Sequence, residues 1–542
     1  MPRMTGGQAI VKSLREHGVD TVFGLPGVQL DHLFNALHDE RNAVQVIHPR
    51  HEQAAGYMAY GYAQSSGRVG VYAVVPGPGL LNTTAALSTA YACNTPVLAL
   101  TGQINARAIG QGYGLLHEIP DQLGLIRGLT KWAHRIEHTS GASGAVKEAF
   151  RQLSTGVIKP VEIEMAMDLL GVACETSIEA ANEAEPPLEP DADLIDEAAR
   201  LLGTAEAPVI FCGGGALEAG DALLELAEML QAPVVSHRMG KGIVSDRHYL
   251  AQNLKAGHRL WARADVVLAV GTRLQQQTMT WGMDANIKII RIDLDPAQMY
   301  RFGKPAVGIV ADARAGTCAL VERLPSINPK RASRQDELEG LKAAVHQELV
   351  EKLGPQAAFI DVLRDVLPDD GIFVDELTQV GYVSRNLFPA YSPRSYICSG
   401  YQGTLGAGFP SALGVKVAHP DKPVISINGD GGFMFNVQEL STAALHGIGV
   451  VTVVFNDSAY GNVKRMQEDL YGGRVIGSAL KNPNFVAMAE SFGVSGVRAD
   501  GPEALKVELE RALGASGPTL IEVPVEKMPD PWGISQPFDR AR

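Results

Sequence analysis

The stretch that decides the fold is residues 424–457, VISINGDGGFMFNVQELSTAALHGIGVVTVVFND. It begins with an apolar run typical of a buried strand, turns at glycines around Asp430, continues through a helical pattern and ends on a second apolar run at Asp457. A strand, a helix and another strand in this order favour a parallel pair, because parallel strands need a crossover connection. Open parallel sheets bind ligands at the carboxyl ends of their strands. We therefore expect Asp430 and Asp457 to lie together at such an edge.

The same alternation of strand-like and helical runs extends through all 542 residues. It favours the α/β class, with doubly wound, mainly parallel sheets, and the length suggests about three domains. The expected organisation is a first domain at 1–172, an acidic, proline-bearing linker at 173–190, a Rossmann-like middle domain at 191–326, a polar linker at 327–355 and a third domain at 356–542.

Short, apolar runs bounded by turn residues mark the expected strands. They are VDTVFG, AVQVIH, RVGVYAVV, TPVLALTG and PVEIEM in the first domain, APVIFCGGG, APVVS, ADVVLAVG and IKIIRIDLDP in the middle domain, and GIFVDEL, PVISINGDGGF, VVTVVFND and PTLIEVPV in the third.

Composition excludes several classes of protein. The net charge of −13 is spread without basic clusters, so nucleic acid is not an expected partner. We find neither an apolar run long enough to span a membrane nor the apolar core of a signal peptide. The five cysteines are scattered, odd in number and without metal-ligand spacing, which favours reduced thiols in the cytoplasm.

The glycines around Asp430 predict an anion site. Gly429, Gly431 and Gly432 allow a tight turn and a close approach of the backbone to a bulky anion. Two acids on adjacent strand ends, beside such amides, suit Mg²⁺ bound together with a diphosphate. The alternative is a simple turn in which Asp430 caps the following helix, and from this motif alone the two are evenly balanced.

Glu52 opens a helix of small residues in HEQAAGYMAYGYA, directly after the expected strand AVQVIH. An acid in a first helical turn is also explained by the helix dipole, and position alone favours that structural role.

Taken together, these motifs resemble those of thiamine-diphosphate-dependent enzymes. The resemblance rests on GDGGFMFNVQEL followed by FND, on HEQAAGYMAYGYA, VVPGPGLLN and VFGLPG, and on GTLGAGFPSALG and LTGQI. It covers the whole chain and is closest to the branch of acetolactate synthase and benzaldehyde lyase. It implies a pyrimidine-binding, a middle and a diphosphate-binding domain.

The resemblance also implies roles for individual residues. Asp430, Asp457 and the carbonyl of Ala459 would hold Mg²⁺, although relatives more often have Asn at position 457. Glu52 would hydrogen-bond the aminopyrimidine of thiamine diphosphate and so activate it, and Gln103 would face the reaction centre. Further cofactor-binding positions implied are Gly24, Pro26, Gly27, Pro76, Thr378, Gln379, Gly403, Leu405, Gly429, Gly431, Gly432, Tyr460, Gly461 and Asn462.

Two departures from the family pattern bear on the activity. His117 and Glu118 stand where acetolactate synthases have a Phe-Gln pair. The two residues would either move protons near the reacting carbon or belong to a solvated loop, and the sequence favours neither role over the other. In the middle domain, FCGGGALEAG is expected to be a strand-helix turn. There, VGTRLQQQTMTWG departs from the pattern of flavin-binding relatives, so FAD is possible but a purely structural domain is favoured.

The implied activity is decarboxylation or carboligation of 2-oxo acids, aldehydes or 2-hydroxy ketones. Alternatives are an acyl-CoA decarboxylase or lyase of the oxalyl-CoA type and a catalytically idle homologue. The resemblance further implies a homodimer or a dimer of dimers, with active sites that combine the first domain of one subunit and the third of another. Trp532 would belong to a C-terminal lid or anchor the chain end, and the anchor is slightly favoured.

Overall fold

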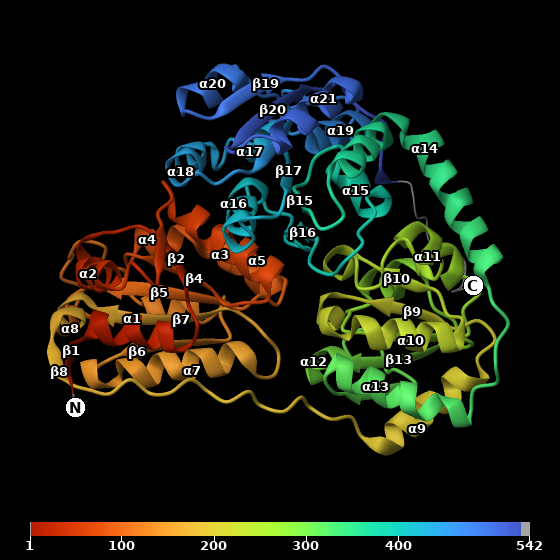
Figure 1. Ribbon diagram of the computed structural model, residues 1–542, viewed down its shortest axis with the longest axis horizontal. Coiled ribbons are helices and arrows are strands. Elements are labelled where there is room, and N and C mark those ends of the chain that lie inside the picture. Colours follow the sequence, from red (N-terminus) through yellow and green to blue (C-terminus); the bar gives the residue numbers. More distant parts are fainter. Residues whose placement is uncertain (1, 533–542) are drawn as a thin grey trace.

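Three six-stranded parallel sheets, one in each expected domain, form the framework of the protein (Figure 1). The computed structural model describes residues 2–532. Helices flank the sheets, and the three domains surround a common centre (Figure 1). The α/β class with three parallel-sheet domains is thereby confirmed.

The first domain has the strand order β3-β2-β4-β5-β7-β6. Its strands are β2 (Thr21–Gly24), β3 (Gln45–Ile47), β4 (Gly70–Val74), β5 (Val97–Gln103), β6 (Trp132–Ile136) and β7 (Val161–Ala166). Its helices are α1 (Gly6–Glu16), α2 (Asp31–Asp39), α3 (Glu52–Ser66), α4 (Pro78–Asn82), α5 (Thr84–Ala92), α6 (Gln122–Ile126), α7 (Ala142–Ser154) and α8 (Met167–Gly171). Every residue of β4, β5 and β7 is buried, as expected for inner strands covered on both faces.

The middle domain has the strand order β11-β10-β9-β12-β13-β14. Its strands are β9 (Val209–Cys212), β10 (Val234–Ser236), β11 (Ala251–Gln252), β12 (Val266–Val270), β13 (Lys288–Asp293) and β14 (Val307–Val310). Its helices are α9 (Ala192–Thr204), α10 (Gly220–Leu230), α11 (Leu254–Trp261), α12 (Pro296–Met299) and α13 (Ala313–Arg323). The order reverses between β9 and β12, where doubly wound sheets open a ligand crevice.

The third domain has the order β16-β15-β17-β18-β20-β19, which repeats that of the first domain strand for strand. Its strands are β15 (Ile372–Asp375), β16 (Tyr396–Cys398), β17 (Val424–Gly429), β18 (Val451–Asn456), β19 (Ser495–Arg498) and β20 (Thr519–Pro524). Its helices are α14 (Gln335–Val366), α15 (Gly381–Leu387), α16 (Gly408–Ala418), α17 (Asp430–Phe433), α18 (Leu440–His446), α19 (Gly461–Leu470), α20 (Phe485–Ser491) and α21 (Pro502–Leu513).

The two expected linkers differ in structure. The first begins with β8 (Ala173–Glu175), which pairs antiparallel with β1 (Arg3–Thr5), and residues 176–190 then contain neither helix nor strand. The second is helical from Gln335 onward, because it contains the first part of α14, and this helix bends at Leu353 before Pro355. Pro355 removes a backbone donor and bends the helix there.

The first and third domains pack through α3 and α16 (Figure 1). A Cβ on Gly61 would lie 2.0 Å from the Ser411 carbonyl oxygen, and one on Gly414 would lie 1.9 Å from that of Met58. Glycine therefore permits this close crossing, and one hydrophobic core spans both domains. Within residues 2–532, no helix combines the length and the apolar character needed to cross a membrane.

Candidate active site

Two carboxylates lie side by side at the carboxyl edge of the third sheet. Asp430 follows β17, Asp457 follows β18, and these strands are parallel neighbours. Asp430 is 2% exposed and accepts a hydrogen bond from the Asn482 amide at 2.6 Å. Asn482, which the sequence did not suggest, comes from a loop far along the chain and also bonds Asn456.

The two adjacent carboxylates favour a bound cation. Burial raises the pKa of Asp430, and burial together with the charge of Asp430 raises the pKa of Asp457 to about 6. A bound cation would reverse both effects. No cluster of three or more His, Cys, Asp or Glu side chains suited to a metal occurs in residues 2–532, so further ligands here would be oxygens of the backbone, of amide or hydroxyl side chains, or of a bound phosphate. Ala459 lies in the turn after Asp457, where its amide donates to Asp457, and its carbonyl could provide a backbone oxygen ligand.

Glycines surround the carboxylates because no side chain fits there. A Cβ on Gly432 would lie 1.9 Å from Oε1 of Glu376, and one on Gly461 would lie 2.3 Å from Oδ2 of Asp457. A Cβ on Gly431 would contact the ring of Tyr460 at 2.7 Å. The donor set and the backbone of this glycine turn fit a metal-bound diphosphate.

Gln379 connects Asp457 to the C-terminal segment at Met528. Its amide nitrogen donates to Oδ2 of Asp457 at 2.9 Å, and its oxygen accepts from Arg465 at 3.0 Å and from the Met528 amide at 2.8 Å. By contrast, the Thr378 hydroxyl accepts from the amides of the next turn and serves as a local cap.

The C-terminal segment also contacts a residue beside this site. The indole of Trp532 donates to Oδ1 of Asn462 at 2.8 Å and lies 4.8 Å from the ring of Tyr382. These contacts attach the last described residues to the beginning of α19.

A buried acid positions the loop that contains Gly403 and Leu405. Glu376, at the end of β15, accepts hydrogen bonds from the amides of Gly406 at 2.8 Å and Gly408 at 3.1 Å. Burial raises its pKa to about 7. The sequence analysis did not identify Glu376. Two signals were available: an acid directly after an apolar strand, and a glycine-rich loop about 30 residues later whose amides needed an acceptor. Gly403 has φ +59, and Leu405 is half-buried.

Glu52 begins α3 and is half-buried. Its Oε2 accepts a hydrogen bond from the Asn82 amide at 2.9 Å. The flanking residues contact the third domain of the same chain, because the Arg50 amide donates to Glu439 and Gln53 lies 3.5 Å from Asn436. The structure thus leaves one oxygen of Glu52 for another partner.

The loops after β2 and β4 lie against each other at the edge of the first sheet. A Cβ on Gly24 would lie 2.7 Å from the Ala73 carbonyl oxygen, and one on Gly27 would lie 2.5 Å from Val75. Pro26 is in the first of these loops and Pro76 in the second. These glycines allow the two loops to approach.

A buried polar network supports the second of these loops. The Gly77 amide donates to Gln122 at 2.9 Å, and the Gln122 amide donates to Glu164 at 2.7 Å. Gln103 lies 3.4 Å from the same carboxylate, which is also paired with Arg135. Gln122 and Glu164 were not anticipated from the sequence, since only the folded sheet brings them together.

His117 and Glu118 have different partners. Nδ1 of His117 lies 3.0 Å from Oε1 of Gln29. The carboxylate of Glu118 accepts from the amides of Gly112 at 3.1 Å and Leu115 at 2.8 Å, so it closes its own loop.

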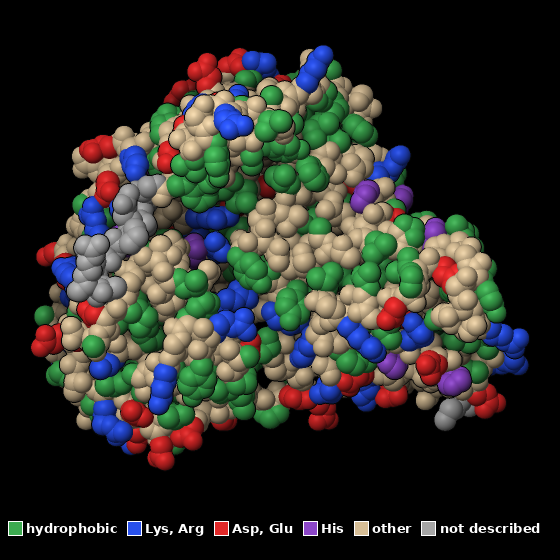
Figure 2. Space-filling view, turned by 180° about the vertical axis from the view of Figure 1, so that it is seen from behind, with side chains coloured by type: hydrophobic (Ala, Val, Ile, Leu, Met, Phe, Trp, Pro, Cys, Tyr) green, Lys and Arg blue, Asp and Glu red, His purple; other side chains and the backbone are tan. Residues whose placement is uncertain are grey.

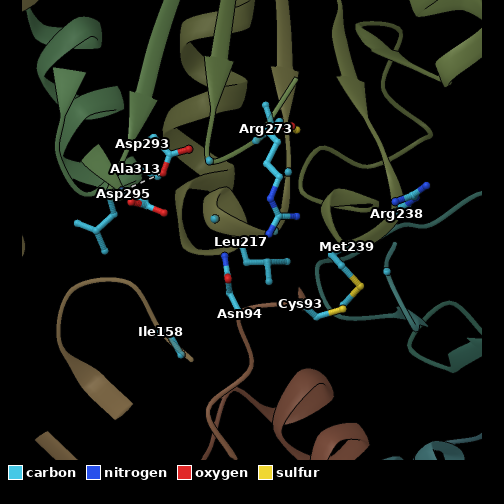
Figure 3. A pocket seen from close by; sticks show the side chains of 18 of the residues that line it. Cys93, Asn94, Ile158, Leu217, Arg238, Met239, Arg273, Asp293, Asp295 and Ala313 are labelled. Carbon is cyan, nitrogen blue, oxygen red and sulfur yellow. Dashed lines mark hydrogen bonds between the residues drawn. The ribbon is translucent and has the colours of Figure 1, made fainter. Parts of the chain in front are cut away.

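A cavity of about 420 Å³ lies where the three domains meet, at the strand reversal of the middle sheet. Figure 2 shows the molecule from behind. Lys and Arg side chains gather around the hollow at the centre of that face. The glycine turn at 213–215, expected to be structural only, lines the cavity. Arg273 points into the cavity, and Asp293 and Asp295 lie to the left of Arg273 in this view (Figure 3). The Arg273 guanidinium also lies 4.8 Å from the centre of the Tyr401 ring, next to the loop of Gly403.

Comparisons with known proteins agree with this architecture. Family models of thiamine pyrophosphate enzymes match residues 4–125 (N-terminal TPP binding domain), 195–321 (central domain) and 377–523 (C-terminal TPP binding domain). A probable 2-ketoarginine decarboxylase of Pseudomonas aeruginosa is 32% identical, over 96% of this chain and 94% of the relative. A probable acetolactate synthase large subunit of Methanocaldococcus jannaschii is 34% identical, over 97% and 93%. The acetolactate synthase isozyme 3 large subunit of Escherichia coli is 32% identical, over 95% and 93%.

Proposed function

Because the chain belongs to the thiamine pyrophosphate enzymes, in the branch of the acetolactate synthase large subunits, we propose that its carboxylate edge and Glu52 serve one coenzyme site. The chain is a thiamine-diphosphate-dependent enzyme that acts on 2-oxo acids by decarboxylation or carboligation. The observation that carries the proposed site is the adjacent pair of carboxylates, Asp430 buried and Asp457 half-buried, in a glycine turn at the ends of neighbouring parallel strands.

Each part of the site has a defined task in this proposal. Asp430, Asp457 and the Ala459 carbonyl hold Mg²⁺, and the amides around Gly431 and Gly432 bind the diphosphate. Thiamine diphosphate supplies, when bound, the carbanion chemistry at the carbonyl carbon. Glu52 hydrogen-bonds the pyrimidine ring through the oxygen that Asn82 leaves available.

Exposed apolar side chains support an oligomer. Large hydrophobic residues are exposed around the loops at the carboxyl edge of the first sheet, at Val28, Leu81, Tyr113, Leu115 and Leu116, and on or beside α19, at Val463, Met466, Leu470, Tyr471 and Ile476. Such patches mark interaction surfaces when they lie near a site. We propose a homodimer or a dimer of dimers in which these surfaces meet and Glu52 of one subunit serves the metal site of another. The five free thiols suit the cytoplasm.

A panel of 2-oxo acids and aldehydes tests the function. Protein loaded with Mg²⁺ and thiamine diphosphate is incubated with each compound, and products are identified by mass spectrometry. We expect CO₂ and an aldehyde or a 2-hydroxy ketone, lost on chelation of the metal. Absence of product from every compound would identify a catalytically idle homologue and contradict the proposal.

The middle-domain cavity favours a second candidate, an enzyme of the oxalyl-CoA type. Its glycine turn, its cations and the acids Asp293 and Asp295 suit a nucleotide diphosphate, which CoA, ADP and FAD share. Calorimetry with each ligand, together with the visible spectrum of the purified protein, distinguishes them. CoA binding with turnover of an acyl-CoA would support this candidate. Saturable FAD binding with a flavin spectrum, or no binding of any ligand, would contradict it.

A further inference from the structure

His117 and Gln29 form a hydrogen-bonded pair at the carboxyl edge of the first sheet. Gln29 lies in a short helix, η1 (Val28–Leu30), after β2 and is 3% exposed, and His117 is half-buried in the loop before α6. Nδ1 of His117 lies 3.0 Å from Oε1 of Gln29. The amide nitrogen of Gln29 donates to the Leu116 carbonyl oxygen at 3.1 Å.

These two contacts decide which ring nitrogen carries the proton. The Leu116 carbonyl can only accept, so the amide nitrogen of Gln29 must face it and the amide oxygen must face His117. An amide oxygen also can only accept, so Nδ1 of His117 carries a hydrogen. In the neutral ring Nε2 is then the proton acceptor, and in the charged ring it is the proton donor.

The backbone places this pair beside the crevice of the first domain. His117 has φ +69, a left-handed conformation that is uncommon outside glycine and worth explaining when it occurs near a site. A Cβ on Gly77 would lie 2.3 Å from the His117 carbonyl oxygen, and one on Gly102 would lie 3.0 Å from the Gln29 carbonyl oxygen. The pair therefore rests on the loop that follows β4 and on the carboxyl end of β5.

We propose that Gln29 is a positioning residue that holds His117 with Nε2 available to exchange a proton with the reacting 2-oxo acid, an inference that rests on the function proposed above. When a 2-oxo acid is converted into CO₂ and an aldehyde, the bond to the carboxylate carbon breaks and a C–H bond forms at the former carbonyl carbon. Nε2–H of the charged ring supplies that proton, and water returns one to the ring. Two acids belong to the loops and strands around this pair: Glu118 accepts from loop amides, and Glu164 accepts from Gln122, which supports the Gly77 loop.

Two substitutions of Gln29 separate the effect of its hydrogen-bond acceptor from the effect of its side-chain shape. Gln29→Met keeps the length of the side chain but removes the acceptor, and Gln29→Glu keeps an acceptor and adds a charge. Gln111→Met is the matched control, because it makes the same change at an exposed position of the same loop. The measurements are aldehyde formation against pH and the nitrogen-15 signals of the His117 ring, assigned with His117→Asn.

We expect Gln29→Met to slow aldehyde formation about 10- to 100-fold and to shift the ring toward the Nε2–H tautomer. Gln29→Glu should move the alkaline limb of the pH profile upward by about one unit, because a neighbouring carboxylate favours the charged ring. An active parent enzyme whose Gln29→Met variant keeps the parental tautomer and pH profile would overturn the inference, whether or not turnover falls. Failure of the parent to convert any 2-oxo acid would instead overturn the proposed function.

Discussion

The first and third domains have sheets with the same strand order but crevices of different chemistry. In both domains, the loops that follow the first and third strands in chain order meet where the strand order of the sheet reverses. These strands are β2 and β4 in the first domain and β15 and β17 in the third. In the third domain these loops begin with Glu376 and Asp430, and Asp457 follows the next strand. In the first they contain glycines, prolines and Gln29, while Glu52 follows the edge strand β3.

The comparison shows that one topology provides the same place for a ligand twice and that loop residues decide what binds there. Acids and glycines make the crevice of the third domain suitable for a metal and a diphosphate. Amides and an imidazole make the first suitable for a heterocycle and for proton transfer. The predictions below test this division of tasks.

Glu52→Gln gives the largest expected effect. Loss of the acid should lower turnover about 100- to 10,000-fold, because general acid-base catalysis contributes a factor of this size. Binding of Mg²⁺ and thiamine diphosphate, measured by calorimetry, should be retained because the third domain provides those ligands. Asp31→Asn, which changes an exposed acid in the first turn of another helix, is the control for a helix-dipole role. Equal activity of both variants would end the proposed role of Glu52.

Asp430→Asn and Asp457→Asn test the acidic crevice itself. Asp430→Asn should weaken Mg²⁺ binding about 100-fold or more, and Asp457→Asn about 10-fold, since the amide oxygen still coordinates but the charge is lost. Metal titrations of cofactor binding measure both. Asp370→Asn, at an exposed acid, should behave as the parent. Unchanged metal affinity in Asp430→Asn would place the metal elsewhere.

Glu376→Gln tests the buried acid through pH. Its folded pKa of about 7 exceeds the unfolded value, so its contribution to stability is complete below about pH 4.5 and is lost as pH rises to about 7. The difference in unfolding free energy between parent and variant should change by up to about 3 kcal/mol over this range. The charge of neighbouring Asp375 acts in the same direction. Denaturant titrations at several pH values measure it, and a difference that does not vary with pH would contradict the assigned pKa.

The expected strands show what the sequence could reveal. All four inner strands of each sheet were predicted from apolar runs, and β3 was also predicted. The strands not predicted, β1, β6, β8, β11, β14, β16 and β19, all lie at sheet edges, β1 and β8 because their sheet has only two strands. Edge strands are shorter or more polar because only one neighbour pairs with them, so WAHRI of β6 gives little apolar signal.

The candidate site was visible where chemistry is concentrated in one motif and hidden where it depends on distant contacts. Asp430 and Asp457 stand out beside glycines at strand ends. Asn482 and Glu164 gain their roles only through folding, because their partners lie far away in the chain. The helix within residues 335–355 was missed because its polar surface resembles a linker.

Trp532→Phe has the smallest expected effect. It removes the hydrogen bond to Asn462 but keeps an aromatic ring against Tyr382. Loss of one such bond corresponds to about 1 kcal/mol, so affinity for thiamine diphosphate should fall no more than about 5-fold. Calorimetry against the parent measures this change. A loss of turnover as large as that of Glu52→Gln would show that the segment acts as a catalytic lid and not as an anchor.

Mixed dimers test most directly the central claim that Glu52 of one subunit acts on a coenzyme held by Asp430 of another. Chains with Glu52→Gln and chains with Asp430→Ala are co-expressed with different tags, and dimers containing both are purified. The account predicts inactive homodimers and a mixed dimer with about half the parental turnover, because one of its two sites combines two unaltered domains. A mixed dimer as inactive as either homodimer would contradict it, since each chain would then hold its own complete site.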